Sequence, residues 1–110
     1  MSVDCSAHII MGWFVENDKI YDYKEKCYAE EMDMSDFCWP INAYSRDTDY
    51  VYGINIARTD YFTFIEPDMM NVEAWEGDED WERCKAEFAA DFPNEYANLK
   101  PAFFLVNRWW

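Results

Sequence analysis

The fold is decided by residues 60–92, which read DYFTFIEPDMMNVEAWEGDEDWERCKAEFAADF. In the second half of this stretch, large apolar side chains recur at spacings of three, four and four residues, which predicts one face of an α-helix. Asp78 is the expected N-cap of that helix, because acids in and before the first turn are favoured by the helix dipole. Pro93 is expected to end the helix. The predicted apolar face consists of Trp81, Cys84, Phe88 and Phe92.

The same stretch concentrates negative charge. Between Arg58 and Arg83 there are nine carboxylates and no Lys or Arg. Pairing within the helix is predicted only near its start, between Glu79 and Arg83 and between Glu82 and Lys85. The nine acids are Asp60, Glu66, Asp68, Glu73, Glu76, Asp78, Glu79, Asp80 and Glu82. We therefore expect an apolar helix face against a core and a dense negative charge toward solvent.

Four other segments are predicted to be strands, because they alternate in polarity or are rich in β-branched and aromatic residues. They are residues 6–15, 50–57, 61–65 and 102–110. In the first of them Ala7, Ile9, Met11, Trp13 and Val15 fall on one face. In the second, the face is formed by Tyr50, Tyr52, Ile54 and Ile56.

The segment that follows the first strand allows two interpretations. Apolar residues at helical offsets predict a helix over about residues 21–33, after a turn at residues 16–19. The alternative is a hairpin in which residues 19–23 return as a strand. The stretch around Pro40 is predicted to be a connection, and residues 68–77 a loop.

This order of elements predicts one α+β domain over residues 1–110. Strand, helix, strand, strand, helix, strand is the order of a small ferredoxin-like βαββαβ sandwich, with an antiparallel sheet and the helices on one face. The chain is long enough to bury a core of its own.

No catalytic residue, cofactor or metal site is predicted. His8 is the only histidine, and in a strand it points away from the face that holds Cys5. A structural role is therefore expected for it. The four cysteines match no pattern of paired metal ligands, and the three glycines form no phosphate-binding loop.

The cysteines and the N-terminus indicate a cytoplasmic protein. No positively charged region followed by an apolar segment opens the chain, and no apolar stretch is long enough to span a membrane. The four cysteines are accordingly expected to be reduced thiols.

The charge balance predicts the kind of partner. There are 23 Asp and Glu against nine Lys and Arg, a net charge of -14. Direct binding of nucleic acid or of an anionic membrane is disfavoured, because both need basic patches. We expect a non-enzymatic protein-binding module, a nucleic-acid mimic of the inhibitor type that phages and mobile elements use, which occupies a basic surface of a nucleic-acid-binding protein. The predicted partner-binding residues are Glu66, Asp68, Glu73, Glu76, Asp78, Glu79, Asp80, Glu82 and, as an aromatic anchor, Trp75.

Other interpretations remain open at this point. The acids could form a solvated face that only maintains solubility. The chain could bind a small molecule or a divalent cation. It could also be a structural protein that self-associates, as a homodimer paired through an edge strand at residues 103–110.

Overall fold

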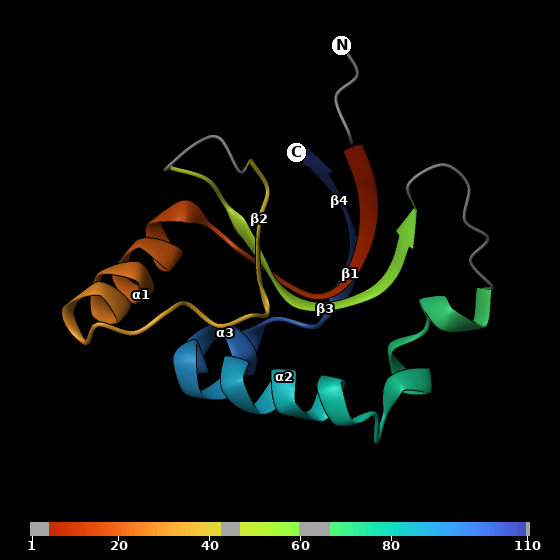
Figure 1. Ribbon diagram of the computed structural model, residues 1–110. Coiled ribbons are helices and arrows are strands. Elements are labelled where there is room, and N and C mark those ends of the chain that lie inside the picture. Colours follow the sequence, from red (N-terminus) through yellow and green to blue (C-terminus); the bar gives the residue numbers. More distant parts are fainter. Residues whose placement is uncertain (1–4, 43–46, 60–66, 110) are drawn as a thin grey trace, which may run out of the picture.

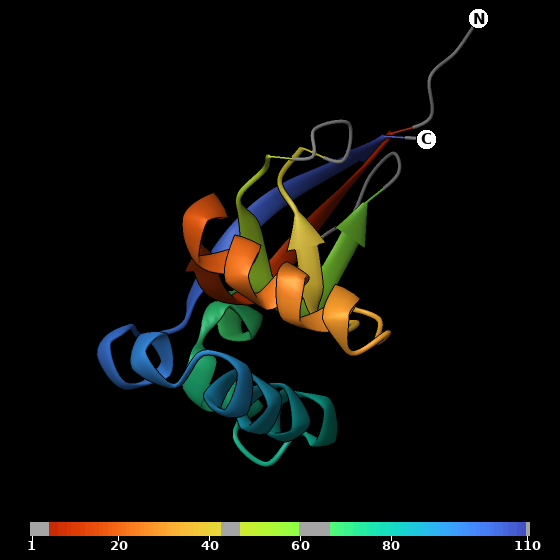
Figure 2. The same cartoon turned by 90° about the vertical axis from the view of Figure 1, so that its left-hand side faces the viewer.

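A computed structural model describes residues 5–42, 47–59 and 67–109 of the chain. It is an α+β structure with a four-stranded antiparallel sheet and three α-helices, and Figures 1 and 2 show α2 and α3 beneath the curved sheet and α1 at one end of it. The elements in chain order are β1 (Cys5–Val15), α1 (Asn17–Ala29), β2 (Cys38–Pro40), β3 (Tyr50–Thr59), the 3₁₀ helices η1 (Pro67–Met70) and η2 (Val72–Trp75), α2 (Glu79–Asp91), α3 (Pro93–Asn98) and β4 (Ala102–Trp109).

The sheet has the strand order β2-β3-β1-β4, and every neighbouring pair is antiparallel. β1 and β3 are the central strands, and β2 and β4 are the edges. Gly12 of β1 faces Gly53 of β3, and Figure 1 shows that both strands are strongly curved. A Cβ on either glycine would collide with the backbone of the opposite strand, so only glycine allows this close approach.

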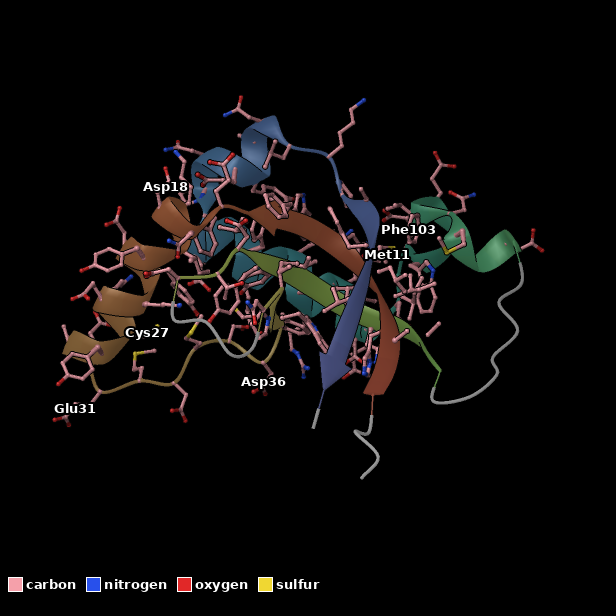
Figure 3. All side chains as sticks on the ribbon, turned by 90° about the horizontal axis from the view of Figure 1, so that it is seen from above. Met11, Asp18, Cys27, Glu31, Asp36 and Phe103 are labelled. Carbon is pink, nitrogen blue, oxygen red and sulfur yellow. The ribbon has the colours of Figure 1, made fainter. Side chains whose placement is uncertain are left out.

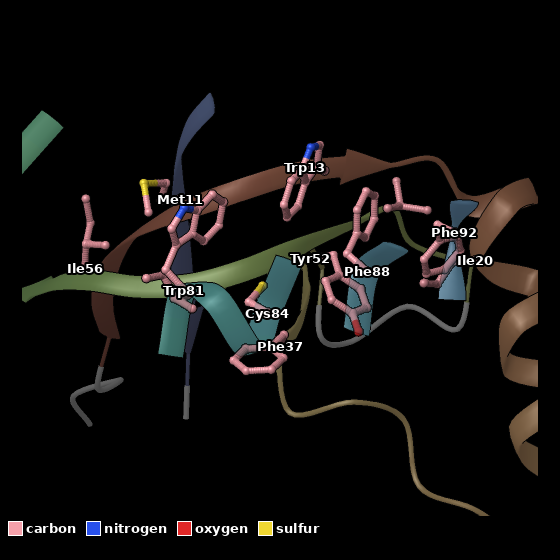
Figure 4. Close-up of a cluster of buried hydrophobic side chains, with 12 residues drawn as sticks. Met11, Trp13, Ile20, Phe37, Tyr52, Ile56, Trp81, Cys84, Phe88 and Phe92 are labelled. Atoms are coloured by element: carbon pink, nitrogen blue, oxygen red, sulfur yellow. The ribbon is translucent and has the colours of Figure 1, made fainter. Parts of the chain in front are cut away.

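The main core fills the space between the sheet and α2. The predicted faces of the first strand and of the second helix meet here: Trp13 stacks on Trp81 and on Phe88, with ring centroids 5.2 and 4.3 Å apart (Figure 4). Ile20 of α1 joins the same cluster from the end of the sheet. The buried residues of this core are Met11, Trp13, Val15, Ile20, Phe37, Tyr52, Ile54, Ile56, Trp81, Cys84, Phe88 and Phe92.

The other face of the sheet is its concave face, and it carries a smaller cluster. Ile10, Val51 and Val106 are buried there, and Trp39 and Phe104 pack against them. None of the three α-helices of the described chain covers this face (Figure 1). Because successive side chains of a strand point to opposite faces, the sheet separates the large core next to α2 from this smaller cluster.

Several boundaries differ from the prediction. The helix predicted at residues 21–33 forms four residues earlier, at Asn17–Ala29, and the hairpin alternative is wrong. The N–H of Asn17 donates to Asp49 Oδ1 at 2.7 Å, a contact from a distant part of the chain that fixes the helix start. α1 contributes Ile20 to the core that α2 covers, and it lies at the end of the sheet (Figure 1).

Two further corrections concern the segments between the helices. Residues 38–40 were predicted to be a connection but pair with β3 as β2. The loop predicted at residues 68–77 contains η1 and η2. The strand predicted at residues 61–65 lies outside the described residues. Asp78 caps α2, as predicted, and Pro93 both ends that helix and begins α3.

Candidate functional site

Three of the predicted residues, Trp75, Asp78 and Asp80, line one cleft of about 310 Å³. The other lining residues come from β2, β3, the segment before β2, and α2. We call this cavity the acidic cleft. Its full lining is Asp36, Phe37, Trp39, Gly53, Ile54, Asn55, Trp75, Asp78, Asp80 and Arg83.

Hydrogen bonds at the ends of η2 and α2 fix the positions of Trp75 and Asp78, two of the predicted residues in the cleft. The Asn71 side chain accepts from the Glu73 N–H at 3.1 Å and so starts η2. The Asp78 N–H donates to the Trp75 carbonyl at 3.0 Å, and Asp78 Oδ1 accepts from the Trp81 N–H at 3.0 Å. Gly77, with φ of 85°, supplies the left-handed conformation that this sharp turn requires. Trp75 and Asp78 are therefore held at a fixed separation.

A second part of the cleft is built on β3. The Gly53 N–H donates to the carbonyl of Phe37 at 2.8 Å, and the Gly53 carbonyl accepts from the indole Nε1–H of Trp39 at 3.3 Å. Both hydrogen bonds hold the start of β2 against the central sheet. As a result the half-buried Trp39 ring and the exposed Asp36 carboxylate reach the same cavity.

The charges in the cleft favour a cation. Among the described residues that line it, Arg83 is the one cation, against the carboxylates of Asp36, Asp78 and Asp80. Arg83 lies 3.6 Å from Asp80, and its guanidinium carbon lies 5.1 Å from the centroid of the Phe37 ring. The chain itself therefore shows a guanidinium bound between a carboxylate and an aromatic face at this position.

This arrangement can bind a lysine or arginine side chain from another protein. The indole rings of Trp39 and Trp75 offer apolar surface for the methylene stem, and the carboxylates offer acceptors for the charged head. A cation in contact with an aromatic face gains roughly 0.5–2 kcal/mol, depending on how far it is desolvated.

Lys85 neutralises two of the predicted acids. Its Nζ lies 3.4 Å from Glu76 and 2.9 Å from Glu82. The hydrogen bond from Lys85, with a second from the Gly77 N–H, lowers the pKa of Glu82, and the same contact with Glu82 raises the pKa of Lys85. The pairing of Glu82 with Lys85 was predicted. The contact of Lys85 with Glu76 was not predicted, because nine residues separate the two in sequence.

The other predicted acids that the structure describes do not line the cleft. Asp68, Glu73 and Glu79 are exposed, and none of them lines the cavity. Glu66 lies outside the described residues. Arg83, which was expected to pair with Glu79, instead pairs with Asp80 and with Glu87 at 4.0 Å.

The negative surface extends beyond the predicted residues, and the strands of the sheet do not contribute to it. Within residues 5–42, 47–59 and 67–109, none of the four strands contains an Asp or Glu, so the carboxylates of these residues belong to helices or connections. Besides the start of α2, the acids gather in the segment after α1, and Figure 3 shows Glu31 and Asp36 of that segment on the outside of the molecule. α1 itself carries three acids and three lysines and adds no net charge. Asp36 is the residue that joins this second group to the acidic cleft.

Sequence reasoning missed Asp36, Trp39, Asn55 and Arg83 as cleft residues. Asp36 was one acid among many, with no spacing that marks it. For Trp39 a signal existed, because the residue before a proline favours extended backbone. The segment around Trp39 was nevertheless predicted to be a connection, because a strand of three residues is too short to show a periodic pattern.

His8, for which a structural role was expected, is buried. It is 4% exposed, its Nδ1 lies 2.9 Å from the Asn55 side-chain amide, and its ring centroid lies 5.3 Å from that of Trp39. In the part of the chain that is described, no three His, Cys, Asp or Glu side chains come close enough together to hold a metal ion.

Comparison of the chain with known protein families, with curated proteins and with solved structures gives no match. Of the helices described, none has the length and apolar character needed to cross a membrane.

Proposed function

We propose that this chain is a non-enzymatic protein-binding module that occupies a basic surface of a nucleic-acid-binding protein and competes there with nucleic acid. The observation that carries the proposal is the acidic cleft, which combines three carboxylates with two tryptophans in a chain of net charge -14. In this proposal the cleft holds a basic side chain of the partner, and the surrounding acids face the basic groove. The origin in a phage or mobile element and the cytoplasmic location belong to the same proposal.

The two kinds of residue have different roles in it. The negative charge of the segment after α1, of η2 and of the start of α2 accelerates the encounter, and this steering is screened beyond about 8 Å at physiological salt. The buried contact of a basic side chain with Trp39 and Trp75 then limits dissociation, since aromatic anchors dominate binding energy at interfaces. Binding should therefore depend both on salt and on the tryptophans.

A separate part of the proposal concerns the fold class. We propose the ferredoxin-like class, in which a split βαβ unit leaves the first and third strands at the centre. The support is the position of β1 and β3 as central strands, with β2 beside β3 and β4 beside β1.

The test begins with affinity capture from the native cell at low salt and elution at high salt. The retained protein is purified, and its complex with duplex DNA or RNA is titrated with the chain. We expect displacement of the nucleic acid, with an affinity that falls as salt rises. A complex with the same affinity at every ionic strength, or one that leaves the nucleic acid bound, would contradict the proposal.

Two matched variants locate the binding surface. The first removes two charges and one aromatic ring from the cleft, as Asp36→Asn, Asp80→Asn and Trp75→Ala. The second removes the same groups from exposed positions on and after α1, as Glu30→Gln, Asp33→Asn and Tyr28→Ala. We expect the cleft variant to lose about tenfold or more in affinity and the control far less. Equal losses would show that only total charge matters.

Self-association is a second candidate, favoured by one observation. β4 is an edge strand of eight residues, and Leu105 on it is 68% exposed. Pairing of β4 with its copy would cover this side chain and satisfy the outer backbone groups of the strand. Sedimentation at increasing protein concentration decides the matter: a strict monomer at millimolar concentration excludes this function.

A further inference from the structure

A second cavity, of about 520 Å³, lies where the edge of β1 has no neighbouring strand. β3 pairs with β1 as far as Val15, whereas β4 pairs with β1 only as far as Gly12. Figure 3 shows β1 continuing past the start of β4 toward α1. The edge of β1 from Trp13 to Val15 is therefore open on the β4 side in the described chain. We call the space beside this edge the edge cavity.

The edge cavity lies at the rim of the sheet, because side chains from both faces of the sheet line it. Trp13 and Val15 belong to the face that α2 covers, and Phe14 and Phe104 belong to the concave face. The rings of Phe14 and Phe104 are stacked, with centroids 6.4 Å apart. Another part of the wall is residues 98–100, which lead from α3 to β4. An extended segment bound in this cavity would continue the sheet.

The backbone groups of Phe14 point toward the open edge. In an antiparallel sheet, successive residues of a central strand direct their N–H and C=O groups to opposite neighbouring strands. The Gly53 N–H donates to the Phe37 carbonyl at 2.8 Å, so Gly53 of β3 faces β2. Tyr52 of β3 consequently faces β1, where it pairs with Trp13. Phe14, which follows Trp13, therefore faces away from β3, toward the side on which β4 has ended.

Glu16 extends the open edge by one more residue that faces the same way. Its φ of -64° and ψ of 154° are those of extended backbone. Its carbonyl accepts from the N–H groups of Lys19 and Ile20 at the start of α1, so only its N–H remains for a strand. The edge thus offers the N–H and C=O of Phe14 and the N–H of Glu16. An extended peptide binds to such an edge through main-chain hydrogen bonds.

The start of β4 limits the length of a strand that can bind here. A peptide antiparallel to β1 runs in the same direction as β4 and in line with it. Since Gly12 pairs with Ala102, the preceding Pro101 closes the far end of the open edge. The last residue of an added strand therefore lies opposite Phe14. A peptide that continued in line would collide with β4, so the edge fits the end of a chain.

The charges at the two ends of the edge select the direction of the peptide. Lys100 is exposed at the closed end, next to Pro101, and Glu16 is exposed at the open end. Neither forms an ion pair within the described residues, whereas Lys19 lies 3.8 Å from Glu95. A C-terminal carboxylate near Lys100 and a basic side chain near Glu16 complement these charges. The reverse direction would bring an N-terminal ammonium group to Lys100.

We propose that the edge cavity binds the extended C-terminal tail of another protein as a short strand antiparallel to β1. The last residue of the tail donates its N–H to the Phe14 carbonyl, and its carboxylate accepts from the Phe14 N–H and faces Lys100. Directly paired residues share a face of the sheet, so a large apolar side chain at this position lies against Phe14 and Phe104. Two residues earlier, a lysine or arginine lies opposite Glu16. This site is separate from the acidic cleft, and neither proposal depends on the other.

The experiment uses the peptide acetyl-Ala-Arg-Val-Phe with a free carboxylate and follows amide hydrogen exchange by NMR in the full ¹⁵N-labelled chain. In the free chain, we expect the N–H of Phe14 to exchange faster than those of Trp13 and Val15, which face β3. Saturating peptide should slow the exchange of Phe14 by about tenfold or more, because its N–H becomes hydrogen-bonded. The exchange of Trp13 and Val15 should stay nearly unchanged.

Methylation of single peptide nitrogens tests the strand pairing. The N–H of the C-terminal Phe of the peptide faces β1, whereas the N–H of the preceding Val faces away from it. Methylation of the Phe nitrogen should lower the affinity by about tenfold or more, and methylation of the Val nitrogen clearly less. Equal losses would contradict the addition of a strand.

Two charge-reversal variants test the position of the carboxylate. Lys100→Glu acts at the closed end of the edge cavity. Lys26→Glu changes the net charge by the same amount at an exposed position of α1 that does not line this cavity. We expect Lys100→Glu to lower the affinity for the free acid by about tenfold and Lys26→Glu far less. Lys100→Glu should have little effect on the C-terminal amide of the same peptide. Equal effects of the two variants on the free acid would contradict the proposal.

Four further results would overturn the proposal. The first is no binding at millimolar peptide. The second is binding that leaves the exchange of Phe14 unchanged. The third is equal affinity for acetyl-phenylalanine alone, because the cavity would then take a small acid and not a strand. The fourth is protection of the Phe14 N–H that grows with protein concentration in the absence of peptide, because a second copy of the chain would then occupy the edge.

Discussion

At the scale of single residues, Asp78 combines a structural contact with a place in the acidic cleft. Its carboxylate accepts the Trp81 N–H and caps α2. We expect Asp78→Ala to lower the free energy of unfolding by about 1 kcal/mol, and Asp78→Asn, which keeps an acceptor, to lower it less. Urea denaturation followed by circular dichroism measures both.

The control for Asp78 is its neighbour in the cleft. Asp80 pairs with an exposed Arg83, so Asp80→Ala should change stability by at most about 0.5 kcal/mol. If Asp80→Ala destabilises as much as Asp78→Ala, the loss reflects charge at the helix start rather than the cap.

The buried thiols predict a loss of stability in alkali. Burial raises the pKa of Cys38 and of Cys84 from 9.0 to about 12. Since the folded-state pKa is the higher one, the contribution is fully present below pH 9.0 and is lost as the pH rises toward 12. Burial also raises the pKa of Tyr52, which donates to Asp91, and adds to the same trend. Urea midpoints at neutral pH and at about pH 10.5 measure the loss.

A double variant separates the thiols from the tyrosine. Cys38→Ala with Cys84→Ala is less stable at neutral pH, because Cys84 is buried and Cys38 is half-buried. Its further loss between neutral and alkaline pH should be smaller than that of the parent chain. An identical alkaline loss in both proteins would assign the effect to groups other than these cysteines.

At the scale of elements, the facing pair Gly12 and Gly53 determines how closely β1 and β3 approach. A Cβ on Gly12 would collide with the carbonyl oxygen of Tyr52, which is backbone and cannot move without opening the sheet. Gly77, by contrast, has open space around it and only its positive φ to maintain. We expect Gly77→Ala to cost about 1 kcal/mol and Gly12→Ala clearly more.

Thermal unfolding of the two alanine variants, monitored by circular dichroism, tests this order. Gly12→Ala should also broaden the indole N–H signal of Trp13, because that residue follows directly in β1. Should the two variants be equally stable, the close approach of the strands would have no energetic importance.

The elements that sequence could predict are those with a long periodic face. The apolar residues of α2 repeat over three turns, and the alternation in β1 continues over its whole length, so both faces were predicted. β2 has three residues and no period. The start of α1 depends on Asp49, 32 residues away, and no local pattern contains that contact.

The acidic cleft was likewise predictable only where its residues are close together in sequence. Trp75, Asp78 and Asp80 lie within six residues of one another, and their shared turn follows from the Gly77 and Asp78 signals. Asp36 and Trp39 join them only because β2 pairs with β3, which is a tertiary event. The partners of Lys85 show the same limit, since Glu76 is nine residues away and reaches it across the turn.

At the scale of the whole molecule, a net charge of -14 on 110 residues opposes compactness. Because the strands carry no carboxylates, the repulsion is concentrated among the helices and connections. We expect the free energy of unfolding to rise as sodium chloride is added up to about 0.5 M, where screening shortens the range of the repulsion to a few ångströms.

Urea denaturation at several concentrations of sodium chloride measures this effect. A variant with Glu30→Lys and Asp33→Lys, at exposed positions after α1, should be more stable at low salt and gain less from added salt. Stability that falls with added salt would mean that the ion pairs of Lys85 and Arg83 outweigh the repulsion.

The two edges of the sheet are unequal, and this limits how copies of the chain could assemble. Within residues 5–42, 47–59 and 67–109, β2 offers three residues, one of them Pro40 without an N–H, whereas β4 offers eight. A strand from a second copy of the chain can therefore pair with β4 but not with β2. If two copies pair through β4, both long edges are used and only the short β2 edges remain at the outside. Growth into amyloid-like fibres by addition of further strands would then stop at the dimer.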